Sequence, residues 1–247
     1  MHSIRKGLLA GLSASLLLVS LTGAAAAHGQ TATYRVTITN LTEGQPFTPP
    51  LVALHRPSVD VFSVGSKASF GVKEIAENGN LAPLLSALGS AKGVGAVDAA
   101  GAPVVPAGSI GETVHQLSST STLTITAPKN ATRFSWVSML ICTNDGFTGV
   151  DSVRLPKHVG DSVSRSTAGY ETSTERNTEA YGDIVPPCQL FVSGTSVPGS
   201  GTSDPTLAEN GVIRHHDGIV GIADLDPSVH GHGWTNPVAT IVVERIG

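Results

Sequence analysis

Apolar and polar residues alternate with a period of two along several stretches of the chain, and this alternation predicts β-strands. Residues 31–40 place apolar side chains on one face and Thr or Arg on the other, as expected for a strand with one solvated face. The apolar run 51–55 predicts a second strand that ends before Pro57, and residues 238–246 alternate again. The pattern therefore predicts a protein built mainly from strands.

The middle of the chain mixes three kinds of pattern. Further strands are expected over residues 111–117, 121–126, 133–141 and 150–155. Helical spacing of apolar residues predicts two short helices between strands, over 69–77 and 81–88. Small or polar residues dominate 93–106 and most of 156–236, so these segments are expected to be loops.

A short polar segment separates two of the expected strands. Asn144, Asp145 and Gly146 predict a turn, because Asn and Asp bond their own backbone and Gly tolerates positive φ. Ca²⁺ binds carboxylate and carbonyl oxygens in proteins, so Asp145, Asp151 and the acidic loop at Glu171 form a candidate oxygen site. The alternative is that Asp145 only makes the turn and that Glu171 is solvated.

The first 27 residues have the features of a signal peptide. Arg5 and Lys6 precede an uncharged apolar run, and residues 25–27 are small, so cleavage before His28 is expected. The apolar run is short for a membrane span, which needs about 20 residues, although an uncleaved anchor is the alternative. We therefore expect a single exported domain, residues 28–247, that is secreted, extracellular or in the cell envelope and has no membrane span.

Charge and composition argue against one class of function and indicate a class of protein. The formal net charge is −4, and it becomes −6 once the two positive charges of residues 1–27 are removed. This acidity, with no cluster of basic residues along the sequence, argues against nucleic-acid binding. Charged residues make up only 14% of the chain, while Gly, Ser, Thr and Pro are abundant. This balance is typical of exported β-proteins with long ordered loops.

The chain has two cysteines, Cys142 and Cys188. In an exported protein an even pair most simply forms one disulfide; two free thiols are the alternative. A bond between them would close an interval of 46 residues and pin the long loop segment.

Histidines offer a second candidate metal site. The loop 215–232 contains His215, His216, His230 and His232, and imidazoles on an extended segment could hold Zn²⁺ or Cu²⁺. This observation supports one alternative function, a secreted metal-dependent hydrolase. The chain has no Gly-x-Ser-x-Gly elbow and no other guiding catalytic motif, so we expect no enzyme. A purely structural envelope protein is a further alternative.

Several segments together resemble the spondin N-terminal domain family, in particular its bacterial secreted members. These segments are 34–42 (Tyr-Arg-Val-Thr-Ile-Thr-Asn-Leu-Thr), 44–50, 138–151, 174–179, 211–213, 218–221 and 232–237. They extend over nearly all of residues 28–247, and 138–151 is the most specific. The resemblance implies an all-β fold, a C2-like antiparallel β-sandwich with short helices in its connections, and a role in adhesion or recognition.

The resemblance also implies a Ca²⁺ site. Asp145 matches the aspartate of the family's Ser-Pro-Asp-Trp segment, Asp151 matches the last residue of its Val-Gly-Val-Asp segment, and Glu171 matches the aspartate that opens Asp-Ala-Gly-Thr. Two positions depart from the animal pattern, because residues 121–126 contain no acid and Glu replaces Asp at 171. The implied partner is an extracellular protein or glycan, which the sequence does not identify.

Overall fold

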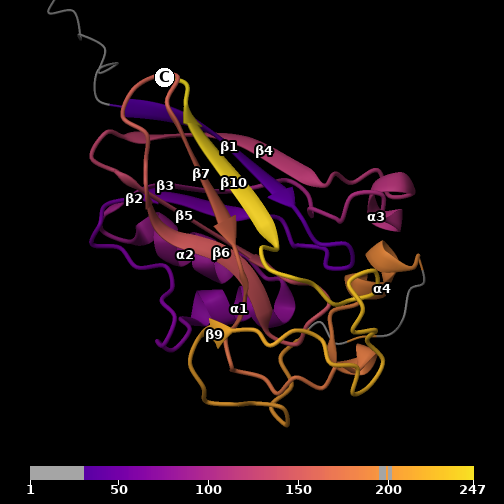
Figure 1. The fold of residues 1–247 in the computed structure, drawn as a ribbon. Helices are drawn as coiled ribbons and strands as arrows, with labels where there is room; N and C mark the ends of the chain where they lie inside the picture. The colour runs from indigo at the N-terminus through magenta and orange to yellow at the C-terminus, as the bar shows by residue number, and fades with distance from the viewer. Residues whose placement is uncertain (1–30, 195–198, 200–201) are drawn as a thin grey trace, which may run out of the picture.

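Two antiparallel β-sheets lie face to face in the computed structural model, which describes residues 31–194, 199 and 202–247 (Figure 1). The expected signal peptide, residues 1–27, lies outside the described residues. None of the described helices is both long and apolar enough to cross a membrane. The expected antiparallel β-sandwich is confirmed.

Each sheet combines strands from both ends of the chain. The four-stranded sheet has the order β4-β1-β10-β7, formed by β4 (Thr120–Pro128), β1 (Thr31–Asn40), β10 (Ala239–Arg245) and β7 (Ser162–Thr167). The six-stranded sheet has the order β3-β2-β5-β6-β8-β9, formed by β3 (Val94–Ala99), β2 (Leu51–His55), β5 (Arg133–Met139), β6 (Gly146–Arg154), β8 (Gly169–Glu171) and β9 (Arg214–His215).

Apolar side chains fill the space between the sheets and also cover the outside of the larger one. Val36 of β1 and Ile241 of β10 meet Trp136 of β5 in the inner core. The opposite face of the six-stranded sheet packs against α1 (Phe70–Asn78) and α2 (Ala82–Ser90), as Figure 1 shows. Strands β2 and β5 are therefore buried on both faces, which explains why β2 is a nearly continuous apolar run. The buried serines of β5, Ser135 and Ser138, are both hydrogen-bonded.

The first helix has a defined start and end. Ser69 precedes it, and its hydroxyl oxygen accepts a hydrogen bond from Val72 N at 3.3 Å, as an N-cap does. Gly79 ends it with φ of 64°, a left-handed conformation that glycine adopts without strain. Both expected helices are confirmed, with their ends shifted by one or two residues.

The strand expected at 111–117 is wrong. The segment begins with helix α3 (Ile110–Thr113), and Ser109 Oγ accepts a hydrogen bond from Glu112 N at 3.4 Å. Glu112 Oε2 in turn accepts a hydrogen bond from Gly108 N at 2.6 Å. A serine followed three residues later by glutamate is a helix-start signal, and here it outweighs the apparent alternation.

Two segments expected to be loops contain regular structure. Residues 93–106 include β3, and 156–236 include β7, β8, β9, the 3₁₀ turn η1 (Tyr181–Asp183) and α4 (Pro187–Val192). Strand β7 has the sequence Ser-Val-Ser-Arg-Ser-Thr and is mostly exposed. It is a strand because all six of its residues pair with β10, and such pairing outweighs the weak strand preference of serine.

Candidate functional site

Asp145 lies in the turn between β5 and β6, as predicted, and its side chain is fully buried. Its Oδ2 accepts hydrogen bonds from Thr174 N at 2.7 Å, from Glu175 N at 3.2 Å and from Thr172 Oγ1 at 3.0 Å. One carboxylate oxygen therefore fixes the segment that follows β8.

The neighbouring Asn144 extends this attachment. Its Oδ1 accepts hydrogen bonds from Thr178 N at 3.0 Å and from Glu179 N at 3.4 Å, and its Nδ2 donates to Thr178 Oγ1 at 3.2 Å. Side-chain oxygens of Asn and Asp readily bond backbone N–H groups in this way. Together the two turn residues hold segment 172–179 against the end of the six-stranded sheet.

Glu179 carries the attachment on to a second loop. Its carboxylate accepts three backbone hydrogen bonds, from Val220 N at 2.7 Å, Gly221 N at 2.6 Å and Ile222 N at 2.8 Å. The turn between β5 and β6 thus organises two loops that are distant in the sequence, 172–179 and 218–224.

Glu171 lies beside Asp145, because it pairs with Gly146 in the ladder between β6 and β8. Its side chain is buried, and its Oε2 accepts a hydrogen bond from Asn177 Nδ2 at 2.7 Å. Its Oε1 lies 2.5 Å from Nε of the half-exposed Arg214. The Nε–H group donates to Ser173 Oγ at 3.2 Å, so the contact with Glu171 is an ion pair without a hydrogen bond.

Two buried oxygens at this corner, Asp145 Oδ1 and Asn177 Oδ1, lack a hydrogen-bond donor among the described residues, and a third, Glu171 Oε1, has no hydrogen bond there but lies against the Arg214 guanidinium. Buried polar atoms are nearly always satisfied, and leaving one without a partner costs about 1–3 kcal/mol. All three are acceptors, and oxygen acceptors from carboxylates and amides are the ligands that Ca²⁺ takes. These oxygens are therefore of the type that Ca²⁺ binds.

Burial also raises the pKa of the carboxyl groups here. The pKa of Asp145 rises to about 6 because the group is buried, against the lowering effect of its N–H donors, and the charge of Glu171 raises it further. Burial raises the pKa of Glu175 to about 7, with further contributions from the charges of Glu77 and Asp145. Burial likewise raises the pKa of Glu171. A bound cation would favour the charged forms that burial disfavours.

Sequence reasoning found Asn144, Asp145 and the acidic loop 170–175, which includes Glu171 and Glu175, but missed other acidic and amide residues around them. Those missed are Glu77, Asn177 and Glu179, which bond within or beside segment 172–179. The available signal was the recurrence of Glu at every fourth position from 171 to 179, in a segment that otherwise reads as a solvated loop.

Asp151, the third predicted ligand, lies away from the corner. It is half-buried within β6, and its Oδ1 accepts hydrogen bonds from Ser135 Oγ at 2.7 Å and from Val61 N at 3.0 Å. As a ligand of the same ion as Asp145 it stays a prediction, and this geometry gives it no support.

Replacing Asp151 by alanine is therefore expected to lower the free energy of unfolding by about 2 kcal/mol, because the Val61 N–H and Ser135 O–H groups lose their charged acceptor. The response of the protein to Ca²⁺ should stay unchanged. Urea unfolding with Ca²⁺ and with EDTA measures both quantities. If Asp151→Ala abolishes the Ca²⁺ response, Asp151 belongs to the ion site.

The four histidines of the loop 215–232 do not converge. The ring of His215 lies 4.9 Å from that of Tyr170, His216 is buried edge-on against Trp234, and the exposed His230 pairs with Glu43. Only His232 joins a cluster of potential ligands.

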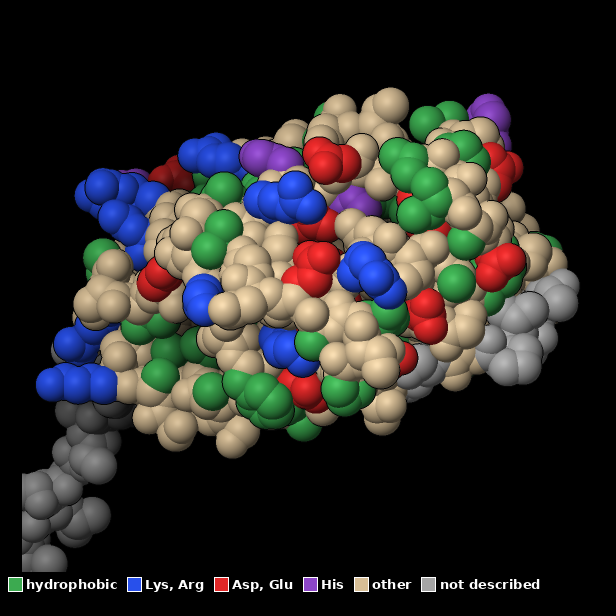
Figure 2. Space-filling view, turned by 90° about the horizontal axis from the view of Figure 1, so that it is seen from below, with side chains coloured by type: hydrophobic (Ala, Val, Ile, Leu, Met, Phe, Trp, Pro, Cys, Tyr) green, Lys and Arg blue, Asp and Glu red, His purple; other side chains and the backbone are tan. Residues whose placement is uncertain are grey.

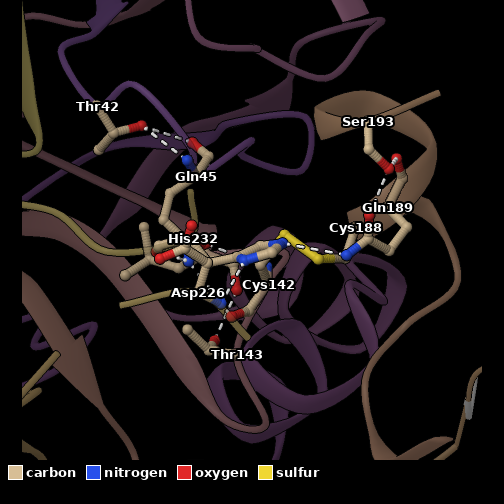
Figure 3. The surroundings of a disulfide bond; sticks show 10 residues. Thr42, Gln45, Cys142, Thr143, Cys188, Gln189, Ser193, Asp226 and His232 are labelled. Carbon is tan, nitrogen blue, oxygen red and sulfur yellow. Dashed lines mark hydrogen bonds between the residues drawn. A yellow bond between two sulfur atoms is a disulfide. The ribbon is translucent and has the colours of Figure 1, made fainter. Parts of the chain in front are cut away.

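That cluster consists of Cys142, Cys188 and His232, and it is the one group of three His, Cys, Asp or Glu ligand atoms within 4.8 Å of one another in the described chain. The two sulfurs form the predicted disulfide, which is thereby confirmed (Figure 3). Zn²⁺ binds cysteine as the thiolate, so the oxidised pair offers no such ligand. No observation in the described residues favours the hydrolase.

Comparison with known proteins gives one match. The family described as Spondin_N matches residues 36–168. This range includes Asp145 and ends three residues before Glu171. No curated protein matches the chain.

Proposed function

The chain belongs to the spondin N-terminal domain family, and from this premise we propose that it is an extracellular binding domain whose β5–β6 corner holds Ca²⁺. The family is extracellular and is not known for enzymatic activity. Asp145 and Glu171 supply carboxylate oxygens, and Asn177 supplies an amide oxygen. The observation that carries the proposal is that Asp145 and Asn177 each have a buried oxygen without a donor among the described residues, while the free oxygen of Glu171 meets only the Arg214 guanidinium.

The role of the ion is organisational. It neutralises carboxylates that burial would otherwise drive toward protonation. The same corner fixes segments 172–179 and 218–224 through Asn144, Asp145 and Glu179. Ion binding would therefore set the shape of the loops at one end of the sandwich.

Adding Ca²⁺ to EDTA-treated protein is expected to raise the melting temperature. At a Ca²⁺ concentration about 100 times Kd the stabilisation is about 2.7 kcal/mol, which corresponds to roughly 5–10 °C for a chain of this length. Asp145→Asn keeps the shape and one acceptor oxygen but loses the charge, so it should abolish the shift. Differential scanning calorimetry measures it, with Asp151→Ala as the control that retains the shift.

The variant Arg214→Gln makes the test informative even if Ca²⁺ does not change the melting temperature of the wild type. The Arg214 guanidinium already pairs with Glu171, so it competes with the ion, and Arg214→Gln is expected to raise the Ca²⁺ affinity. If the wild type does not respond to Ca²⁺ while Arg214→Gln does, Arg214 has taken the place of the ion and the proposal is wrong. If neither responds, the corner is no ion site and a structural role is favoured.

A further inference from the structure

Five basic side chains from three distant segments line one groove of about 540 Å³: Lys129, Arg133, Arg154, Lys157 and Arg245. No cluster of basic residues is visible in the sequence, and that expectation fails here because folding brings residues 129–133, 154–157 and 245 together. The groove lies at the end of the sandwich where Figure 1 marks the C-terminus. On the face shown in Figure 2, Lys and Arg side chains also gather toward one end.

The backbone holds these cations in place. Arg133 and Arg154 are direct partners in the ladder between β5 and β6. Arg245 is fixed by its own hydrogen bonds, because its Nε donates to Gly247 O at 3.0 Å and its Nη1 donates to Lys157 O. The cations are therefore presented by strand ends and a short connection rather than by long loops.

None of the five forms an ion pair with a side-chain carboxylate of the described residues. The ion pairs found there involve other cations, namely Arg35, Lys73, Arg214 and His230. Like charges directly opposite each other on neighbouring strands are destabilising. The Arg133–Arg154 pair is therefore expected to destabilise the sheet, and no ion pair of the described residues offsets this repulsion. An anion bound between the two side chains would offset it.

The floor of the groove is apolar and recessed. Tyr34, Ala131 and Leu155 line it and are buried, and Tyr34 Oη donates to the carbonyl oxygen of Pro156 at 3.4 Å. A flat membrane surface does not reach such a floor. Nucleic-acid bases need exposed aromatic rings for stacking, and the ring of Tyr34 is covered.

We propose that this groove binds an anionic saccharide chain, one that carries carboxylate, sulfate or phosphate groups along its length. The volume is in the range of ligand sites, about 300–1,000 Å³, and arginine pairs with such anions through two parallel hydrogen bonds. The proposal rests on the proposed function as an extracellular binding domain, and it names the chemistry of the ligand. It uses none of the residues of the Ca²⁺ corner.

The test measures binding of the purified protein to a short sulfated oligosaccharide and to its desulfated counterpart by calorimetry. The sulfated chain should bind, weaken as salt is raised because salt screens charge, and compete with inorganic sulfate, while the neutral chain should not bind. The double variant Arg133→Gln/Arg154→Gln should lose at least about tenfold in affinity. It should melt no lower than the wild type, because the like-charge pair is gone.

The control Lys67→Gln/Arg176→Gln changes the net charge equally at exposed positions that contact segment 207–210 and not the groove. It should bind within about twofold of the wild type. An equal loss in both double variants, or unchanged binding by Arg133→Gln/Arg154→Gln, overturns the proposal. Tighter binding to anionic vesicles or to a single-stranded oligonucleotide overturns the choice of a saccharide. Binding should persist in EDTA and in Asp145→Asn, so failure of the Ca²⁺ proposal is distinguishable from failure of this one.

Discussion

Replacing both Cys142 and Cys188 by alanine is expected to lower the free energy of unfolding by roughly 4 kcal/mol. For a chain of this length the melting temperature should fall by roughly 8–15 °C. The disulfide joins residues 46 positions apart, and closing an interval of that length removes conformational freedom from the unfolded chain. Thermal unfolding of the variant and the wild type, both without reductant, measures the difference.

The surroundings of the disulfide indicate which part of the chain loses stability first when the bond is removed. Cys142 stays attached without its sulfur, because Gln45 Oε1 accepts from Cys142 N at 3.1 Å and Gln45 Nε2 donates to His232 O at 2.6 Å (Figure 3). Cys188 lies in α4, a helix of six residues, and helices this short do not persist without tertiary contacts. The amides of α4 should therefore lose hydrogen-exchange protection before those of β5.

Ser193→Ala is a matched control at the end of the same helix. Among the described residues, the Ser193 hydroxyl bonds only to Gln189, through its carbonyl oxygen at 3.2 Å and its Oε1 at 2.5 Å. Its loss should lower the free energy of unfolding by about 1 kcal/mol. A cysteine-free variant that melts within about 2 °C of the wild type would contradict the expected effect of loop closure.

Without Ca²⁺, Asp145 is expected to make the protein less stable as the pH rises, by about 3 kcal/mol between pH 3 and pH 8. Burial raises its pKa from 3.8 to about 6 in the folded protein. The folded state therefore holds this proton more tightly than the unfolded chain does. The stabilisation is complete below the unfolded pKa and is lost as the pH rises through about 6. Glu175, with a pKa raised to about 7, acts in the same direction.

His216 changes the free energy of unfolding in the opposite direction. The pH dependence of the wild type alone therefore combines the contributions of Asp145 and His216. Burial lowers the pKa of His216 from 6.5 to about 4, and its contribution is lost as the pH falls toward 4. Chemical unfolding of the wild type and of Asp145→Asn at each pH, both in EDTA, isolates the aspartate as a difference. Saturating Ca²⁺ should remove that pH-dependent difference, because the bound ion keeps the carboxylate charged. If the stability of the wild type relative to Asp145→Asn rises with pH in EDTA, the assigned protonation is contradicted.

Strands with one buried face were predictable, whereas edges and loops were not. The alternation in β1 and β10 indicates strands with one buried face, and the continuous apolar residues of β2 indicate a strand buried on both faces. Strand β3 was missed because its small residues are only half-buried at an edge. In each case the sequence indicates whether a residue is buried more clearly than it indicates which strand that residue pairs with.

The candidate sites also contain some residues that the sequence indicates and others that only the fold brings together. Asp145 and the acidic loop 170–175 were found from the turn and its carboxylates, and the family resemblance then supported Asp145 and Glu171. Glu179 was missed because its partners, the N–H groups of residues 220–222, are distant in the sequence. The basic groove was missed for a topological reason. Its residues span positions 129 to 245 and meet only because β5 begins where β6 and β10 end.

The polar composition of β7 has a consequence for association between molecules. An edge strand offers unpaired N–H and C=O groups to any other chain, and exposed apolar edges promote aggregation. Strand β7 lies at the edge of the four-stranded sheet, with exposed Ser162, Ser164, Arg165 and Ser166 along it. A second strand docking there would bury hydroxyls and a guanidinium without apolar gain. The residues that make β7 resemble a loop are thus the residues that protect the sheet from growing beyond one chain.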